Sequence, residues 1–118
     1  MKKKRNVGLL LFDEVEVLDF AGPFEVFSVT AGSGEERPFE VKTISETGEA
    51  VTARNGLTVV PDFSIGNAPR FDILIVPGGP GARNREVYNE RLTGWIKKEA
   101  GHTELLLSVC TGALLLAK

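Results

Sequence analysis

Three segments of the chain are almost continuously apolar: residues 7–12, 71–76 and 104–109. This pattern is typical of strands that are covered on both faces, as in a parallel sheet. Residues 39–44 alternate apolar and polar side chains, which indicates a strand nearer the edge of the sheet. Phe20, Phe24 and Phe27 recur at helical spacing, so we predict a helix after the first strand, with Pro23 in its first turn.

Two further elements follow from local signals. Asn55-Gly56 lies between residues 51–54 and 57–60, and this dipeptide is the strongest short-range signal for a β-hairpin. Residues 86–100 have helical spacing and end at Gly101, a common helix stop. The remaining segments are predicted as connections: a basic tail at 2–5, a loop at 32–38, and an irregular stretch at 61–70 with one helical turn at 62–65.

Buried strands that alternate with helices predict an α/β fold. We expect a doubly wound, mostly parallel, flavodoxin-like sheet with a small β-hairpin excursion. The 118 residues are enough for a single domain, 1–118. In such sheets the ligand crevice lies beyond the carboxyl ends of the strands. The three apolar strands end there in an acidic segment, in Gly78-Gly79 and in Cys110.

Composition narrows the function classes. The chain is 42% hydrophobic and 25% charged, with a formal net charge of −2, which gives no reason to expect nucleic acid or an anionic membrane as partner. No apolar run approaches the roughly 20 residues of a membrane span. The single cysteine excludes an internal disulfide and fits the reducing cytoplasm. Since His102 and Cys110 alone cannot form a structural zinc site, no metal is expected. No cofactor is expected either.

Cys110 is the candidate centre of chemistry. We predict a buried strand, a sharp turn at Cys110 and a helix that starts at Thr111, where unpaired N–H groups favour a thiolate. The alternative is a small buried apolar side chain, as free cysteines often are. Backbone N–H groups near Gly79 and Thr111 are candidate donors to a developing negative charge, and a carboxylate from the first loop is a candidate proton carrier.

Each of these parts also has a purely structural interpretation. Gly78 and Gly79 can serve only a tight turn, Asp19 can serve only as a helix cap ahead of Pro23, and Thr111 can simply start a helix. The agreement of three separate stretches favours a site. His102 does not belong to it, because it precedes the Cys110 strand by about eight residues, roughly 25 Å at ~3.3 Å per residue.

Three motifs together resemble the ThiJ/PfpI superfamily, which has the class I glutamine-amidotransferase-like fold. They are residues 17–27 (VLDFAGPFEVF), 72–79 (DILIVPGG) and 108–112 (SVCTG). The resemblance is closest to the isocyanide hydratase branch and to the sensor domains of AraC-type regulators. It implies that Cys110 is the nucleophile of a nucleophile elbow and that Asp19 is its carboxylate partner. Gly78, Gly79 and Thr111 are then the oxyanion and substrate-binding residues.

The resemblance implies a cysteine-dependent hydratase (a lyase) acting on a small molecule, and a homodimer. The alternatives are a ligand-sensing regulator domain and a redox or stress-response protein. Peptidase activity is disfavoured because Thr111, rather than histidine, follows the cysteine. Glu14 or Glu16 can be offered for the glutamate of the glyoxal-handling branch, but Asp19 fits the motif better.

Length is the main departure from the family. Members usually continue for about another half-chain, so we expect a single incomplete domain, truncated after the helix of the elbow. That helix contains Leu114, Leu115 and Leu116 and reads as apolar nearly all round, so we expect it to be buried.

Overall fold

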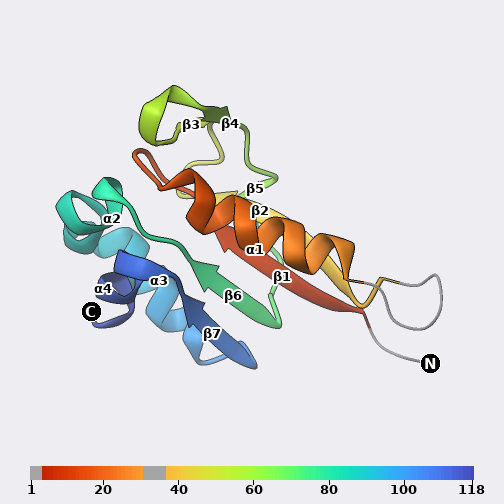
Figure 1. Cartoon of the computed structure of the whole chain (residues 1–118). Coiled ribbons are helices and arrows are strands. Elements are labelled where there is room, and N and C mark those ends of the chain that lie inside the picture. The colour runs from red at the N-terminus through yellow and green to blue at the C-terminus, as the bar shows by residue number, and fades with distance from the viewer. Residues whose placement is uncertain (1–3, 31–36) are drawn as a thin grey trace.

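The computed structural model describes residues 4–30 and 37–118. Residues 2–3 of the basic tail and residues 32–36 of the predicted loop lie outside the described residues. Within the described part, five parallel strands form one sheet in the order β5-β2-β1-β6-β7 (Figure 1). These strands are β1 (Arg5–Leu10), β2 (Phe39–Ser45), β5 (Phe63–Ser64), β6 (Ile73–Val76) and β7 (Leu105–Ser108).

Two helices cover opposite faces of this sheet. Helix α1 (Val17–Val29) connects β1 to β2, and α3 (Glu90–Ala100) lies between β6 and β7. These two connections run in opposite directions away from the central β1–β6 pair, and right-handed crossovers therefore place their helices on opposite faces. In Figure 1, α1 lies in front of the sheet and α3 behind it. The doubly wound, flavodoxin-like α/β fold is thus confirmed.

The central strands β1 and β6 supply much of the core. Val7, Leu9 and Leu10 of β1 are fully buried, and all four residues of β6 are buried. Gly8 is required for this packing, because a Cβ there would come within 2.6 Å of the Phe71 ring. The apolar runs predicted both strands because each strand has a hydrogen-bonded neighbour on either side and a covered surface on both faces.

Strand β7 and the helix after it are less buried than predicted. In the described sheet β7 has a single neighbour, β6, and Leu105 remains 47% exposed. In α4 (Ala113–Leu116) only Leu115 is buried, whereas Leu114 is 44% exposed. Both differences have the same cause: β7 is an edge strand and α4 follows it, and a continuous apolar run is buried only where another element covers it.

Helix α1 begins earlier than predicted. Its N-cap is Glu16, so Pro23 lies in the helix interior rather than in the first turn. The preceding loop decides this start, because the Glu16 N–H donates to the carbonyl of Gly78 at 2.9 Å and fixes the entry of the chain. The apolar face is confirmed in part: Phe20 is buried and Phe27 packs edge-on against Phe39, but Phe24 is 40% exposed.

Two predictions concern the segments between β2 and β6; one is confirmed and the other is wrong. The hairpin forms from β3 (Val51–Thr52) and β4 (Thr58–Val59), joined through η1 (Arg54–Gly56) with φ of 71° at Asn55 and 94° at Gly56. The helical turn predicted at 62–65 is wrong, because this segment pairs with β2 as β5. The Asp62 carboxylate accepts from the backbone N–H of Thr43 at 2.9 Å and holds the segment against that edge.

The predicted helix at 86–100 is divided in two. A short turn η2 (Glu86–Tyr88) follows α2 (Pro80–Asn84), and α3 begins after Asn89. The Asn89 side-chain oxygen accepts from the Leu92 N–H at 3.2 Å, which makes it the N-cap of α3. The predicted end at Gly101 is confirmed. Within residues 4–30 and 37–118, no helix has the length and apolar content needed to cross a bilayer.

Candidate functional site

Three loops meet beyond the carboxyl ends of β1, β6 and β7. The Val109 N–H donates to the carbonyl of Val76 at 3.0 Å, which ties the end of β7 to the end of β6. The Glu16 N–H donates to the Gly78 carbonyl at 2.9 Å, and this bond ties the loop after β1 to the loop after β6. The acidic segment, the double glycine and the cysteine turn therefore adjoin one another, as the parallel topology predicts.

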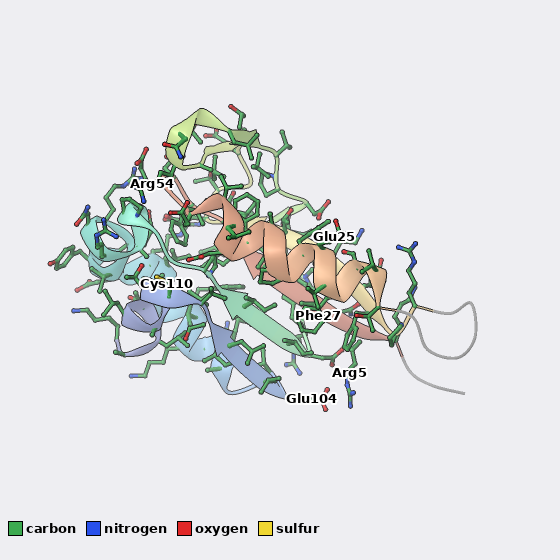
Figure 2. All side chains as sticks on the ribbon, viewed as in Figure 1. Arg5, Glu25, Phe27, Arg54, Glu104 and Cys110 are labelled. Atoms are coloured by element: carbon green, nitrogen blue, oxygen red, sulfur yellow. The ribbon has the colours of Figure 1, made fainter. Side chains whose placement is uncertain are left out.

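Cys110 lies at a strained turn and is exposed. It is the first residue of η3 (Cys110–Gly112), directly after β7, and its φ of 53° lies in the left-handed region that disfavours residues other than glycine (Figure 2). The helical structure begins at Cys110 rather than at Thr111. Because the thiol is exposed in this structure, the interpretation of Cys110 as a small buried apolar side chain is wrong here.

Two glycines allow the turn to lie against the end of β6. A Cβ on Gly112 would come within 2.1 Å of the carbonyl oxygen of Val76. A Cβ on Gly78 would come within 2.6 Å of both the backbone nitrogen and the hydroxyl oxygen of Thr111. Gly78 is therefore required by this close approach of two backbones, and not only by a tight turn.

Hydrogen bonds join four of the predicted site residues. The Thr111 hydroxyl accepts from the Gly79 N–H at 2.9 Å and donates to the Gly79 carbonyl at 3.4 Å. The Asp19 carboxylate accepts from the Gly78 N–H at 3.3 Å. The N–H groups of Gly78 and Gly79 are thus engaged within the protein. Thr111 therefore links the cysteine turn to the glycine loop, in addition to lying at the start of the helical segment. Asp19 is not the cap of α1, whose N-cap is Glu16.

The remaining candidate residues do not contact the thiol. Among the described residues, no hydrogen bond joins Asp19 to Cys110. His102 is exposed after α3, at the amino end of β7, as expected for a residue outside the site. The carboxylate of Glu16 pairs with Arg54 at 3.1 Å, and Glu14 is exposed with a φ of 64°.

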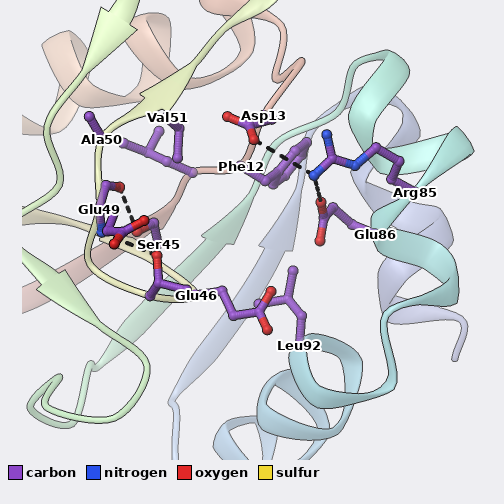
Figure 3. Close-up of a pocket in the computed structure, with 12 residues that line it drawn as sticks. Phe12, Asp13, Ser45, Glu46, Glu49, Ala50, Val51, Arg85, Glu86 and Leu92 are labelled. Carbon is purple, nitrogen blue, oxygen red and sulfur yellow. Dashed lines mark hydrogen bonds and ion pairs between the residues drawn. The ribbon is translucent and has the colours of Figure 1, made fainter.

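A second feature escaped the sequence analysis. A pocket of about 250 Å³ lies beside the ends of β1 and β2 (Figure 3). Its wall includes Glu86, of which only 5% is exposed. Burial raises the pKa of the Glu86 carboxyl above the usual value of 4.5. The Asn89 cap was a signal in the sequence, but a glutamate between a glycine-rich turn and a helix carries no local sign of burial.

The described residues contain no group of three or more histidine, cysteine, aspartate or glutamate side chains placed to hold a metal ion. The groups that meet at the candidate site are an exposed thiol, backbone N–H groups and a carboxylate.

The chain is similar in sequence to known proteins of two kinds, an enzyme and a transcriptional regulator. The chain is 30% identical to the isonitrile hydratase of Pseudomonas putida over 111 residues, which are 94% of this chain and 46% of that enzyme. It is 31% identical to the HTH-type transcriptional regulator GbdR of Pseudomonas aeruginosa over 117 residues, which are 99% of this chain and 31% of the regulator. The chain thus spans less than half the length of either relative.

The fold is also similar to that of solved structures. A ThiJ/PfpI family protein from Pseudomonas syringae superposes with a TM-score of 0.78 at 22% identity, covering 97% of this chain and 45% of that one. The family model described as DJ-1/PfpI matches residues 5–118. From the fold, the cysteine turn and this match, the chain belongs to the DJ-1/PfpI family.

Proposed function

We propose that this chain carries the nucleophile of a cysteine-dependent hydratase that converts an isonitrile (isocyanide) into an N-substituted formamide. The observation that carries the proposal is Cys110, an exposed thiol at a turn with a φ of 53° beyond the carboxyl end of β7. A strained conformation at an exposed nucleophile is typical of functional sites. The similarity to an isonitrile hydratase supports this substrate class.

The proposed reaction has two steps. In the first, a new S–C bond forms between Cys110 and the isonitrile carbon, and the thiol proton ends on the same carbon, giving a thioimidate. In the second, water adds to that carbon, the C–S bond breaks, and one proton each goes to the nitrogen and back to the thiol. The net change is the addition of one water molecule, so no oxidant, reductant or cofactor is required.

The neighbouring groups have distinct proposed roles. Asp19 moves the protons, since it lies in the first turn of α1 and its carboxylate accepts from the Gly78 N–H of the loop that adjoins the cysteine turn. The glycine loop orients Asp19 through the Gly78 N–H, and the Thr111 hydroxyl orders that loop through Gly79. Gly78, Gly79 and Thr111 therefore shape the substrate side of the site, and charge stabilisation by the Gly79 N–H requires it to leave the Thr111 hydroxyl.

The test is formation of a formamide from an aliphatic isonitrile, followed by proton NMR, with wild type, Cys110→Ser and Asp19→Asn. The proposal predicts product with wild type and none above the uncatalysed rate with Cys110→Ser. Equal rates for wild type and Cys110→Ser, or no product with wild type, would contradict it.

A second candidate is a ligand-sensing domain, which the 31% identity to a transcriptional regulator over 99% of the chain favours. A sensor would bind its ligand at the candidate site without converting it into a product. It therefore predicts saturable binding of a small molecule, measured by calorimetry, with no product and with the same affinity in Cys110→Ser.

The proposed assembly is a homodimer. The outer face of α1 supports it, because Leu18, Val26 and Val29 are 76%, 62% and 59% exposed. Apolar side chains that gather on one helix face commonly mark an interface. A second copy of the chain is the proposed partner for this face.

A further inference from the structure

We propose that Asp13 and Arg54 are positioning residues of the candidate site. Through them the β3–β4 hairpin braces the loop after β1, so that the Asp19 carboxylate stays on the Gly78 N–H. This brace is a matter of geometry, and only its effect on turnover rests on the proposed hydratase. In Figure 1 the hairpin forms a separate small sheet beside the loop that leads from β1 into α1.

Backbone hydrogen bonds tie this loop to the first strand of the hairpin and to η1. The Glu14 N–H donates to the Thr52 carbonyl at 2.8 Å, and the Arg54 N–H donates to the Val15 carbonyl at 2.9 Å. Ala53, between the two hairpin residues, is fully buried in the core. The loop is therefore bonded to a part of the hairpin that is itself anchored.

Two side chains complete the brace. The Thr52 N–H donates to Asp13 Oδ1 at 2.9 Å, and Arg54 Nη1 donates to Glu16 Oε1 at 3.1 Å. Each of the residues 13–16 thus has a hydrogen bond to the hairpin. The side chains of Asp13, Arg54 and Glu16 are 47%, 49% and 34% exposed, so we expect these two contacts to contribute only modestly to stability. Their removal should leave the fold intact and alter where the loop lies.

The opposite side of the same loop rests on the glycine loop. The Gly81 N–H donates to the Glu14 carbonyl at 3.1 Å, and the Glu16 N–H donates to the Gly78 carbonyl at 2.9 Å. A Cβ on Gly79 would come within 2.5 Å of the Glu16 nitrogen. Residues 13–16 are therefore held between the hairpin and the glycine loop.

This double hold fixes the start of α1. Glu14 has a φ of 64°, and such a strained conformation persists only where the surrounding contacts enforce it. Glu16 is the N-cap of α1, and its carbonyl accepts from the Asp19 N–H at 3.1 Å, so the place of Glu16 sets the place of Asp19. The bond from the Gly78 N–H to Asp19 is 3.3 Å long, beyond the usual range of about 2.7 to 3.2 Å, so a small shift of the loop should break it.

The experiment compares wild type with Asp13→Ala and Arg54→Ala. Asp13→Asn and Arg54→Lys are the conservative variants, because they keep an acceptor oxygen and a cation. Asp13→Asn also removes the charge that faces Arg85 at 3.7 Å, which separates that ion pair from the hydrogen bond. Arg5→Ala is the matched control, because it removes another exposed arginine–glutamate pair of 3.1 Å, with Glu104, at the amino ends of β1 and β7.

The first measurement is amide hydrogen exchange by NMR at a single pH. The Gly78 amide reports the bond to Asp19, and the Leu9 amide in β1 reports global opening. In Asp13→Ala and Arg54→Ala, Gly78 should exchange faster by up to about tenfold, the scale of one lost hydrogen bond, while Leu9 stays unchanged. The conservative variants and Arg5→Ala should follow wild type.

Unchanged Gly78 exchange in both alanine variants overturns the brace. An equal acceleration of Gly78 and Leu9 also overturns it, because that result reports general destabilisation. Should Asp13→Ala fail to fold, Arg54→Ala and Arg54→Lys decide the point in the same way.

The second measurement is turnover of an aliphatic isonitrile. Both alanine variants should lose about tenfold or more in kcat at an unchanged KM, since misplacement of a catalytic group acts on the transition state. Wild-type kcat in both alanine variants overturns the positioning role. An inactive wild type overturns the proposed hydratase instead, and the exchange of the Gly78 amide then decides the brace by itself.

Discussion

Gly78 and Thr111 approach so closely that a single added methyl group on Gly78 would lie 2.6 Å from both the backbone nitrogen and the hydroxyl oxygen of Thr111. This contact joins the loop after β6 to the turn that holds Cys110. Gly112 lies just as tightly on the carbonyl of Val76, so the backbone of the cysteine turn packs directly against the backbone after β6. Its geometry should therefore respond to very small substitutions.

Gly78→Ala should destabilise the protein by about 1 to 3 kcal/mol, because the backbone nitrogens of Thr111 and Gly112 lie within 3.0 Å of the added Cβ and cannot rotate away. Urea unfolding measures this change. The control is Gly94→Ala in α3, where no described residue outside the adjacent helix backbone comes within 4 Å of the added Cβ; this variant should stabilise the protein by about 0.5 to 1 kcal/mol. Equal effects of the two variants would contradict the close approach.

Cys110→Gly should be more stable than Cys110→Ala, by about 0.5 to 1 kcal/mol. A left-handed φ costs about 1 to 2 kcal/mol for a residue with a Cβ, and this exceeds the entropic cost of glycine. At Ser108, an exposed residue of β7, the order should reverse, with the alanine variant more stable. Thermal unfolding of the four variants decides the point, and a lower stability of Cys110→Gly than of Cys110→Ala would remove the strain argument.

Asp19→Asn and Asp19→Ala should separate the structural and chemical roles of this carboxylate. Asparagine keeps an oxygen for the Gly78 N–H, so its stability should stay within about 0.5 kcal/mol of wild type, while alanine should lose about 1 to 2 kcal/mol. Turnover of an isonitrile should fall in both by about 10²-fold or more. A fully active Asp19→Asn variant would exclude proton transfer by this residue.

Stability should depend on pH through Glu86. Its pKa is raised by burial, so its contribution to stability is fully present below 4.5, the value in the unfolded chain, and is lost as the pH rises through the folded pKa. Glu86→Gln should therefore gain stability relative to wild type as the pH increases from 4 to 8, measured by urea unfolding. A difference that stays constant over this range would contradict the raised pKa.

Val26→Lys should weaken the proposed homodimer without unfolding the chain. Val26 is 62% exposed on α1, so the monomer should change by no more than about 0.5 kcal/mol, while a lysine in the interface would bury a charge. Light scattering after size exclusion gives the mass. Val60→Lys is the matched control, because Val60 is 74% exposed and follows β4 rather than belonging to α1. Dissociation by both variants, or a monomeric wild type, would contradict this interface.

The sequence by itself determined the elements whose signals are local. The apolar runs at 7–12 and 71–76 led to β1 and β6, because strands with two neighbours must be apolar on both faces. Asn55-Gly56 led to the hairpin, because this pair readily adopts positive φ. The positions of Cys110 and of Gly78-Gly79 after strands led to their meeting at one edge, since all parallel strands end there.

Only the tertiary structure decided the features that depend on distant parts of the chain. The acceptor of the Gly78 N–H is Asp19, which is 59 positions away, and no periodicity predicts such a contact. The exposure of β7, the strand at residues 63–64 and the interior position of Pro23 each follow from which neighbour is present rather than from local preference. Burial of Glu86 belongs to the same class, because desolvation is set by the segments that converge on a side chain and not by its own residue type.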